Sequence, residues 1–417
     1  MQCSANDLVQ LKSARPTPVH SCPHVLGVCV VWDLLNHRRM SRHDLGRFDV
    51  NNANDASRGA DSNPEVVLHW AGLVTDEVFS FLGPISSSLA RAGVAQTIVL
   101  NDEPRYAHLL SRFDPSIRLV LIPAAAGRCR RWKRARDAFV AALRADAPSI
   151  VHLHGFIPYL LRAGAVGRLT PQAKVLYSPH GSRALASGWG PFALLRWLGN
   201  HLFGATAAHD IANVSSEARA LKASSKQRVT LVESAVAPVF FGVDRAEAEH
   251  PLVVTGNRIP DMRGAATFAQ LAVLLSEESL GVRFDWIGRS DPLSESALKA
   301  ANVKVSDVTD DAERARRFAA GWLYVAPQGK NGFPLFLAEA MAAGLACVAI
   351  DTDYHRDLIR HASTGYLCRN EEEMVARIAM LIDSPELRAV IGDAARREAI
   401  RRFSGQNFRD ALVVSSA

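Results

Sequence analysis

The chain has 417 residues, of which 48% are hydrophobic and 22% charged, and its formal net charge is +6 at pH 7. This length exceeds the ~250–300 residues at which a single hydrophobic core stops growing, so it predicts two domains. The composition excludes a wholly disordered, collagen-like or coiled-coil protein. The longest apolar stretches are interrupted by Asp33 or Glu339 and fall short of the ~20 residues that a membrane-spanning helix needs. The six cysteines form no C-x-x-C pair, which fits a reducing compartment and predicts a cytoplasmic protein.

Residues 1–64 differ from the rest of the chain. The run from Asn51 to Pro64 is rich in Asn, Asp, Ser and Gly and offers almost nothing apolar to bury, so it cannot offset the entropy cost of ordering. An apolar stretch from Val25 to Leu35 is followed by Arg38 and Arg39 where a signal peptide would need small residues. We therefore expect residues 1–64 to lie outside the fold, either as a disordered extension or because translation in the cell starts further downstream.

From Glu65 onward, short apolar runs alternate with helical stretches. Continuous β-branched runs between helices are typical of a parallel sheet that is buried on both faces. The first series predicts strands at 66–68, 97–100, 119–122, 150–153 and 175–177, and helices over about 79–92 and 131–144. The same rhythm restarts with expected strands at 252–254, 284–287, 322–325 and 347–350.

The two series predict an α/β protein with two doubly wound Rossmann-like domains that face each other across a cleft. We place the first domain at 65–240, a linker at 241–250 and the second domain at 251–402, with residues 403–417 crossing back to the first domain. In such sheets ligands bind outside the carboxyl ends of the strands. The ligand site is therefore expected in the cleft between the domains.

The most informative segment is PQGKNGFPLFLAEAMAAG, residues 327–344. Its glycines predict a loop, Pro334 can open a helix and Gly344 can close it. Free N–H groups at such a helix start can bind an anion. Glu339 has only apolar neighbours three and four residues away, and a lone carboxylate there costs several kcal/mol unless it is paired. Either an internal arginine or backbone donor pairs with Glu339, or its oxygens accept hydrogen bonds from a sugar diol in the cleft.

The segment resembles the E-x7-E region of GT-B fold glycosyltransferases, in particular the family-4-like retaining group that uses nucleotide-sugar donors. The resemblance extends over roughly residues 65 to 405, and the other landmarks occur in the family's order. They are the strand ends 148–155 (PSIVHLHG) and 178–181 (SPHG), the step 210–215, Gly256–Arg258 with Arg263–Gly264, 287–288 and 364–367.

The resemblance implies a role for each matching position. Arg258 and Arg263 would hold the diphosphate of the donor, and fixed cations there would stabilise the leaving group as charge develops. Glu339 would hold the ribose of the donor. The donor loop would comprise Asn331, Gly332, Phe333, Pro334 and Leu335, with N–H groups presented to the sugar and phosphate.

On the first domain, His180 is expected at the catalytic face, with His154 and Gly72 beside it in the cleft, whereas His152 is assigned to packing. A buried structural role remains open for both cleft histidines. Asn331 replaces the first glutamate of the family signature, which keeps hydrogen-bonding capacity and loses a charge. No metal site and no cofactor besides the nucleotide sugar is expected.

The basic stretch Arg128–Arg136 contains the densest positive charge of the chain. It is either a solvated helix face or a surface that contacts an anionic membrane, which would suit a lipid-linked acceptor. No nucleic-acid-binding motif accompanies it. The predicted function is transfer of a sugar from a nucleotide diphosphate to a saccharide or lipid-linked hydroxyl acceptor, for cell-surface polysaccharide or glycoconjugate synthesis. The alternatives are a catalytically weakened nucleotide-sugar-binding or scaffold relative, and a nucleotide-sugar epimerase.

Overall fold

The computed structural model describes residues 66–72, 74–123, 128–161, 165–181, 208–224, 228–257, 262–277, 281–288, 290–308, 310–328 and 332–404. The predicted extension 1–64 lies outside these ranges, as do Arg258, Asn331 and residues 405–417.

The first domain is built on a parallel sheet with strand order β3-β2-β1-β4-β5-β6-β7. Its strands are β1 (Val66–Ala71), β2 (Ala95–Asn101), β3 (Arg118–Ile122), β4 (Ile150–His154), β5 (Lys174–Ser178), β6 (Ala208–Ala212) and β7 (Val229–Leu231). Its helices are α2 (Asp76–Arg91), η2 (Pro104–Tyr106), α3 (Ala107–Leu110), α4 (Arg128–Asp146), α5 (Phe156–Leu161), α6 (Ala165–Leu169) and α8 (Ser215–Ser224). The five strands predicted from apolar runs are all present. The central strands β1 and β4 pair in register, with His69 opposite His152.

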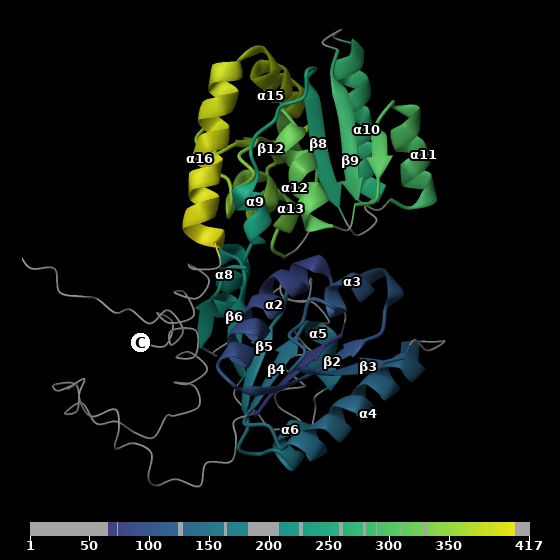
Figure 1. Ribbon diagram of the computed structural model, residues 1–417, viewed down its shortest axis with the longest axis vertical. Coiled ribbons are helices and arrows are strands. Elements are labelled where there is room, and N and C mark those ends of the chain that lie inside the picture. Colours follow the sequence, from purple (N-terminus) through teal and green to yellow (C-terminus); the bar gives the residue numbers. More distant parts are fainter. Residues whose placement is uncertain are drawn as a thin grey trace, which may run out of the picture.

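The second domain has a parallel sheet with strand order β10-β9-β8-β11-β12-β13. Its strands are β8 (Leu252–Asn257), β9 (Arg283–Gly288), β10 (Lys304–Ser306), β11 (Leu323–Ala326), β12 (Ala346–Ile350) and β13 (Tyr366–Cys368). Its helices are α10 (Met262–Glu277), α11 (Pro292–Ala300), α12 (Asp311–Ala320), α13 (Leu335–Ala342), α14 (Asp353–Arg356), α15 (Glu371–Asp383) and α16 (Pro385–Phe403), and α9 (Pro238–Gly242) precedes β8. Figure 1 shows the two domains one above the other, with α9 and the end of α16 near their junction. The predicted α/β architecture is confirmed.

The chain joins the second domain slightly earlier than the sequence suggests. Phe240 of α9 lies in the same buried cluster as Phe318 and Phe336 of the second domain, although residues up to 240 were assigned to the first domain. At the other end, the Val236 amide donates to the Phe403 carbonyl over 3.0 Å, and Arg402 pairs with Glu233. The C-terminal end of α16 therefore lies against the segment that leaves the first domain.

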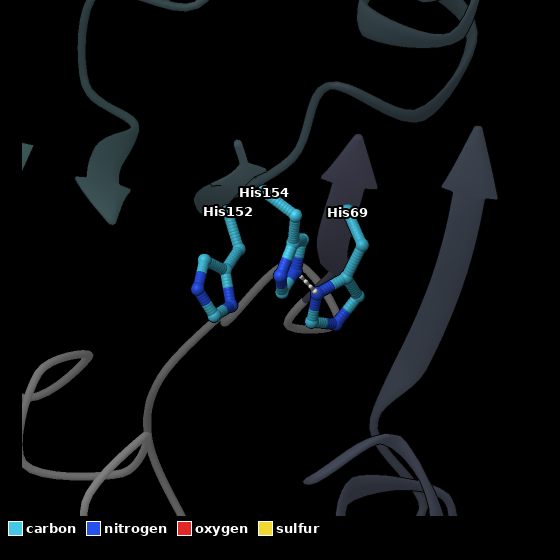
Figure 2. Close-up of side chains that lie close together, drawn as sticks. All are labelled: His69, His152 and His154. Carbon is cyan, nitrogen blue, oxygen red and sulfur yellow. Dashed lines mark hydrogen bonds between the residues drawn. The ribbon is translucent and has the colours of Figure 1, made fainter. Parts of the chain in front are cut away.

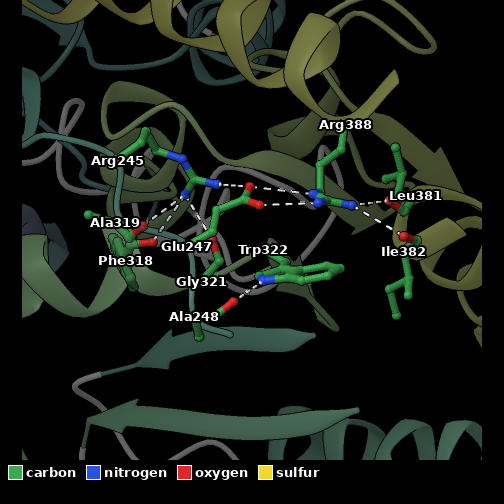
Figure 3. Close-up of polar contacts among 10 residues, drawn as sticks. All are labelled: Arg245, Glu247, Ala248, Phe318, Ala319, Gly321, Trp322, Leu381, Ile382 and Arg388. Atoms are coloured by element: carbon green, nitrogen blue, oxygen red, sulfur yellow. Dashed lines mark hydrogen bonds and ion pairs between the residues drawn. The ribbon is translucent and has the colours of Figure 1, made fainter. Parts of the chain in front are cut away.

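An arginine network fixes the linker to the second domain (Figure 3). The Arg245 guanidinium donates to the carbonyls of Phe318, Ala319 and Gly321, and to Glu247. Arg388 of α16, 5% exposed, donates to both Glu247 oxygens and to the carbonyls of Leu381 and Ile382. Its guanidinium carbon also lies 4.1 Å from the centre of the Trp322 ring. The linker is therefore an ordered part of the second domain.

Replacing Arg388 by leucine is expected to lower the free energy of unfolding by about 3 kcal/mol, because buried carbonyl acceptors and Glu247 lose their donor. Urea denaturation followed by circular dichroism measures this change. Arg397→Leu is the matched control, since Arg397 is exposed on the same helix, and it should shift stability by less than about 0.5 kcal/mol. Equal effects of the two substitutions would contradict the assigned role of the network.

Candidate functional site

A cavity of about 730 Å³ lies between the carboxyl ends of the two sheets. All pairings in both sheets are parallel, so the residues that follow each strand gather at one edge of each domain. The first domain contributes Gly72 after β1, His154 at the end of β4 and His180 after β5. The second domain contributes Gly256 of β8, Gln328 after β11 and the segment 332–337. The cavity lies where the sequence places the ligand site.

The loop before α13 lines this cavity, as predicted. However, the free N–H groups are not at the residues where they were predicted. Gly332, Phe333, Pro334 and Leu335 all line the cavity. Proline has no N–H, and the Leu335 amide donates to the Phe333 carbonyl over 2.9 Å, so neither residue offers a donor to a ligand. The amides of Phe336 and Leu337 lie in the first turn of α13, where N–H groups have no acceptor within the helix. The backbone N–H groups that can bind a ligand therefore lie at Phe336 and Leu337, inside the helix, and not in the loop at 332–335 as predicted.

Gly332 makes the contact between the two walls of the cavity. Its φ is +105°, and a Cβ there would lie 3.4 Å from the Gly181 Cα and the His180 carbonyl oxygen. A side chain would therefore be strained by the backbone conformation and would press on the opposite domain. Glycine at this position allows the donor loop to approach the turn that carries His180.

The structure contradicts the assignment of Glu339 to the ribose. Glu339 is 2% exposed, and both of its oxygens accept hydrogen bonds from the 1% exposed Arg314 of α12, over 2.8 and 2.7 Å. The rings of Phe240 and Phe336 lie 5.1 and 5.0 Å from this guanidinium. Glu339 borders a separate cavity of about 360 Å³ between α2 and α12 and does not line the larger one. The interpretation in which an internal arginine pairs with Glu339 is the one that the structure shows.

Of the two arginines predicted to bind the diphosphate, the structure describes only Arg263. Arg258 lies outside the described residues, as does Asn331. Arg263 is exposed in the first turn of α10 and does not line the cavity, although its neighbour Gly264 does. The role of Arg263 in binding a diphosphate remains a prediction.

His180 and His154 are joined at the cavity wall. His154 Nδ1 lies 3.0 Å from His180 Nε2, and their rings are stacked at 15°. His180 has a φ of +50°, a conformation that is uncommon outside glycine and is typical of functional sites. Burial lowers the pKa of His180 to about 4 and holds that of His154 well below its usual value. Both rings are therefore neutral at pH 7. His152 is buried and bonded to the Ser178 hydroxyl over 2.9 Å, in agreement with its assignment to packing.

Glu217, which the sequence did not indicate as a site residue, holds the turn that carries His180. The backbone N–H of Gly181 donates to its Oε1 over 2.8 Å, and the backbone N–H of Asn213 donates to its Oε2 over 3.0 Å. Burial raises the pKa of this carboxyl to about 7, against the opposing effect of the two amides. Glu217 lies in the first turn of α8, and a carboxylate at such a position was the only available signal.

The contribution of Glu217 to stability should fall as the pH rises. A folded-state pKa near 7, against 4.5 for the carboxyl in the unfolded chain, gives stability that is complete below pH 4.5 and is lost as the pH rises through 7. Glu217→Gln, which cannot ionise, is expected to cost about 1 kcal/mol at pH 5 through poorer hydrogen bonding, and less at pH 8. Urea denaturation at the two pH values measures the difference. A larger cost at pH 8 than at pH 5 would mean that the ionised form is the stabilising one.

Several contacts between described residues join the domains near the cavity. Besides Gly332, the Ser216 amide donates to Asp357 Oδ2 over 2.7 Å, and Arg112 forms an ion pair with Asp311 over 2.8 Å. These pairs cross from the first domain to the second on different sides of the cavity. The described arrangement is therefore one in which the domains touch.

The basic helix α4 lies at the rim of the cavity. Its exposed cations are Arg130, Arg131, Lys133, Arg134 and Arg136. Arg131 and the partly buried Trp132 line the cavity itself, and Arg131 lies 3.9 Å from Glu103. Among the described residues, no helix combines the length and the apolar character that crossing a membrane requires.

Comparisons with known proteins agree with this architecture. Residues 244–398 match the family model described as Glycosyl transferases group 1. A phosphatidyl-myo-inositol mannosyltransferase of Mycolicibacterium smegmatis is 33% identical over 140 residues, which are 31% of this chain and 36% of that protein. The chain spans between 21% and 36% of the curated relatives it matches.

Solved structures of other proteins match over most of the chain, and two of them show the likeness. Anabaena HepE in complex with UDP and glucose superimposes with a TM-score of 0.65 at 16% identity, over 85% of this chain and 100% of that one. A putative UDP-N-acetylglucosamine 2-epimerase from Listeria monocytogenes gives a TM-score of 0.60 at 14% identity, over 85% and 96%. At these identities the superpositions define the fold alone.

Two parallel α/β domains that face each other across a ligand cavity, with these structural relatives, define the chain as a GT-B fold protein. Most of its second domain, residues 244–398, matches the glycosyl transferases group 1 family model.

Proposed function

We propose that the protein is a retaining, family-4-like glycosyltransferase that moves a sugar from a nucleotide diphosphate to a hydroxyl acceptor. The observation that carries this proposal is the cavity between the domains, with the group 1 segment on one wall and the neutral His154–His180 pair on the other. A nucleotide-sugar donor is supported by the UDP bound in the structural relative.

The donor would lie mainly against the second domain. Gly256, Gly264 and the segment 332–337 line the cavity on this side, and the amides of Phe336 and Leu337 lie at the N-terminus of α13, where helix amides stabilise negative charge. Arg258, Arg263 and Asn331 are proposed as further donor contacts on the family resemblance. Glu339 is not, because it holds α13 to α12. We expect the reaction to need no metal ion, since helix amides and arginines can neutralise the leaving group.

The acceptor would enter along the first domain, past Gly72 and the rim of α4. A surface of exposed arginines beside Trp132 suits an anionic lipid headgroup or a lipid-linked sugar. The relative that acts on a phosphatidyl-inositol, according to its name, supports such an acceptor. The protein would then work in the cytoplasm, peripherally on the cytoplasmic face of the membrane, in the synthesis of a cell-surface polysaccharide or glycoconjugate.

Incubating the purified protein with a panel of nucleotide sugars and a lipid extract should release nucleoside diphosphate only when an acceptor is present. His180→Ala is expected to reduce this release about 100-fold or more, because it removes a positioned polar group from the reacting face. His250→Ala is the control, since His250 is exposed in the linker. Interconversion of the nucleotide sugar without an acceptor would instead establish an epimerase, and no turnover of any donor would favour a binding or scaffold role.

A further inference from the structure

A line of three imidazoles runs from the cavity wall into the core of the first domain. His154 Nδ1 lies 3.0 Å from His180 Nε2, and His154 Nε2 lies 3.3 Å from His69 Nδ1. Figure 2 shows the second of these bonds, with His69 and His154 facing each other and His152 beside them. His69 and His154 are 1% and 3% exposed. This chain of hydrogen bonds thus connects His180 at the cavity to His69, which is buried inside the sheet.

The surroundings of His69, at the buried end of this chain of hydrogen bonds, indicate which ring nitrogens donate and which accept. The Gln96 amide nitrogen donates to the Ser86 carbonyl over 2.9 Å, which leaves the Gln96 oxygen as an acceptor. That oxygen and His69 Nε2 are both buried, and neither has a partner at full hydrogen-bond geometry among the described residues. Hydrogen bonding by Gln96 raises the pKa of His69, although the larger effect of burial lowers it to about 4. A proton on His69 Nε2 would point toward the only side-chain acceptor among the described residues that influences this ring, the Gln96 oxygen, and His69 Nδ1 would then accept from His154 Nε2.

The remaining protons follow from the rule that a neutral imidazole has one N–H and one lone pair. Because His69 Nδ1 accepts, His154 donates from Nε2 and accepts at Nδ1. His180 must then donate from Nε2, which leaves the lone pair on its Nδ1. The contact at the cavity end of the hydrogen-bond chain gives the same assignment independently. There the side-chain nitrogen Nδ2 of Asn213, which can only donate, lies 3.5 Å from His180 Nδ1.

We propose that His154, His69 and Gln96 are positioning residues that hold His180 as the neutral Nε2–H tautomer, with its Nδ1 lone pair available to accept a hydrogen bond from a substrate hydroxyl at the cavity. The contact to Asn213 is long, so a sugar hydroxyl can replace it at small cost. A sugar hydroxyl is a natural donor to such a lone pair, and this part of the inference rests on the proposed transfer reaction. The tautomer itself does not depend on that reaction.

The same rings offer a second interpretation, as metal ligands. One nitrogen from each of His69, His152 and His154 lies within 4.8 Å of the others. However, the His152 and His154 rings lie side by side with centroids 4.0 Å apart, and His152 Nε2 is bonded to Ser178. Lone pairs of rings packed in this way do not converge on one point, whereas a hydrogen-bonded chain uses the observed orientations.

The test is nitrogen-15 NMR of the full chain with labelled histidine at pH 7.5, which distinguishes protonated from unprotonated ring nitrogens. The expected result is that His69, His154 and His180 all carry the proton on Nε2. His69→Leu removes the acceptor for His154 and should give mixed tautomers at His154 and His180, with a fall of about tenfold in kcat and little change in the donor KM. His69→Asn, whose side-chain oxygen can take the place of Nδ1, should restore the tautomers and most of the rate. His209→Asn is the control, since the His209 ring is hydrogen-bonded to the Thr230 hydroxyl over 2.8 Å and to none of the three rings.

Three outcomes would overturn the proposal. The first is an Nδ1–H tautomer at any of the three rings in the wild-type protein. The second is equal loss in His69→Leu and His69→Asn. The third is stoichiometric zinc that disappears in His152→Asn. If His69→Leu does not fold, Gln96→Leu removes the acceptor of His69 Nε2–H and should alter the His69 tautomer alone. Correct tautomers in a protein that transfers no sugar would refute the proposed function and leave the chain of hydrogen bonds intact.

Discussion

Glu339→Ala is expected to lower the free energy of unfolding by about 3–5 kcal/mol, because it leaves the Arg314 guanidinium buried without its main counter-charge. The pair is 2% and 1% exposed and is bonded through both carboxylate oxygens. Breaking such a pair is costly, whereas replacing both members by apolar residues of similar size is often neutral. The double variant Arg314→Met with Glu339→Leu should therefore recover most of the lost stability.

Urea denaturation of the wild type, the single variant and the double variant measures this coupling. Glu313→Ala is the control, since Glu313 pairs with Arg316 and Arg317 at the surface of the same helix α12 and should change stability by less than about 1 kcal/mol. If Glu339→Ala instead keeps normal stability and loses only nucleotide-sugar binding, the carboxylate is a ligand after all. That result would reinstate the role inferred from the family resemblance.

The second large effect is a loss of stability of the first domain in acid. Burial lowers the pKa of His69 and His180 from 6.5 to about 4 and holds those of His152 and His154 well below 6.5. A lowered pKa gives stability that is complete above pH 6.5 and is lost as the pH falls toward 4, because the unfolded chain takes up protons first. For His69, which is 1% exposed, the difference corresponds to about 3 kcal/mol.

Free energies of unfolding at pH 7.5, 6 and 5 measure this dependence, and they should fall steeply because several histidines act together. Glu217 acts in the opposite direction, since its pKa is raised to about 7, so the slope should become steeper in Glu217→Gln. His152→Asn should flatten it by removing one of the four rings. A stability that does not change between pH 7.5 and 5 would mean that these rings are accessible to protons in the folded state.

The sequence predicted the parts of the structure that burial alone determines. A strand such as 346–350 is a continuous apolar run because both faces of a parallel sheet are covered. The short strands β7 and β10 have partly exposed faces and no such run, so they were not predicted. The helix after the glycine loop was predicted because Pro334 and Gly344 are local signals.

The sequence predicted those site residues that lie at the end of a strand, but not the partners that tertiary packing brings to them. His154 and His180 were found because each ends or follows a strand before a glycine. The partner of Glu339 could not be found, since Arg314 lies on another helix and only the packing of α12 against α13 brings the two together. His69 lies inside an apolar strand, and its value became apparent only from the register that sets it opposite His152.

The most direct test of the central claim is hydrogen–deuterium exchange with the nucleotide sugar that stabilises the protein most in a thermal-shift panel. If the cavity between the domains binds the donor, exchange should slow at the end of β8, across 327–337 and in the turn 178–181, on both walls together. Protection confined to one domain away from these segments, or no stabilisation by any nucleotide sugar, would contradict the account.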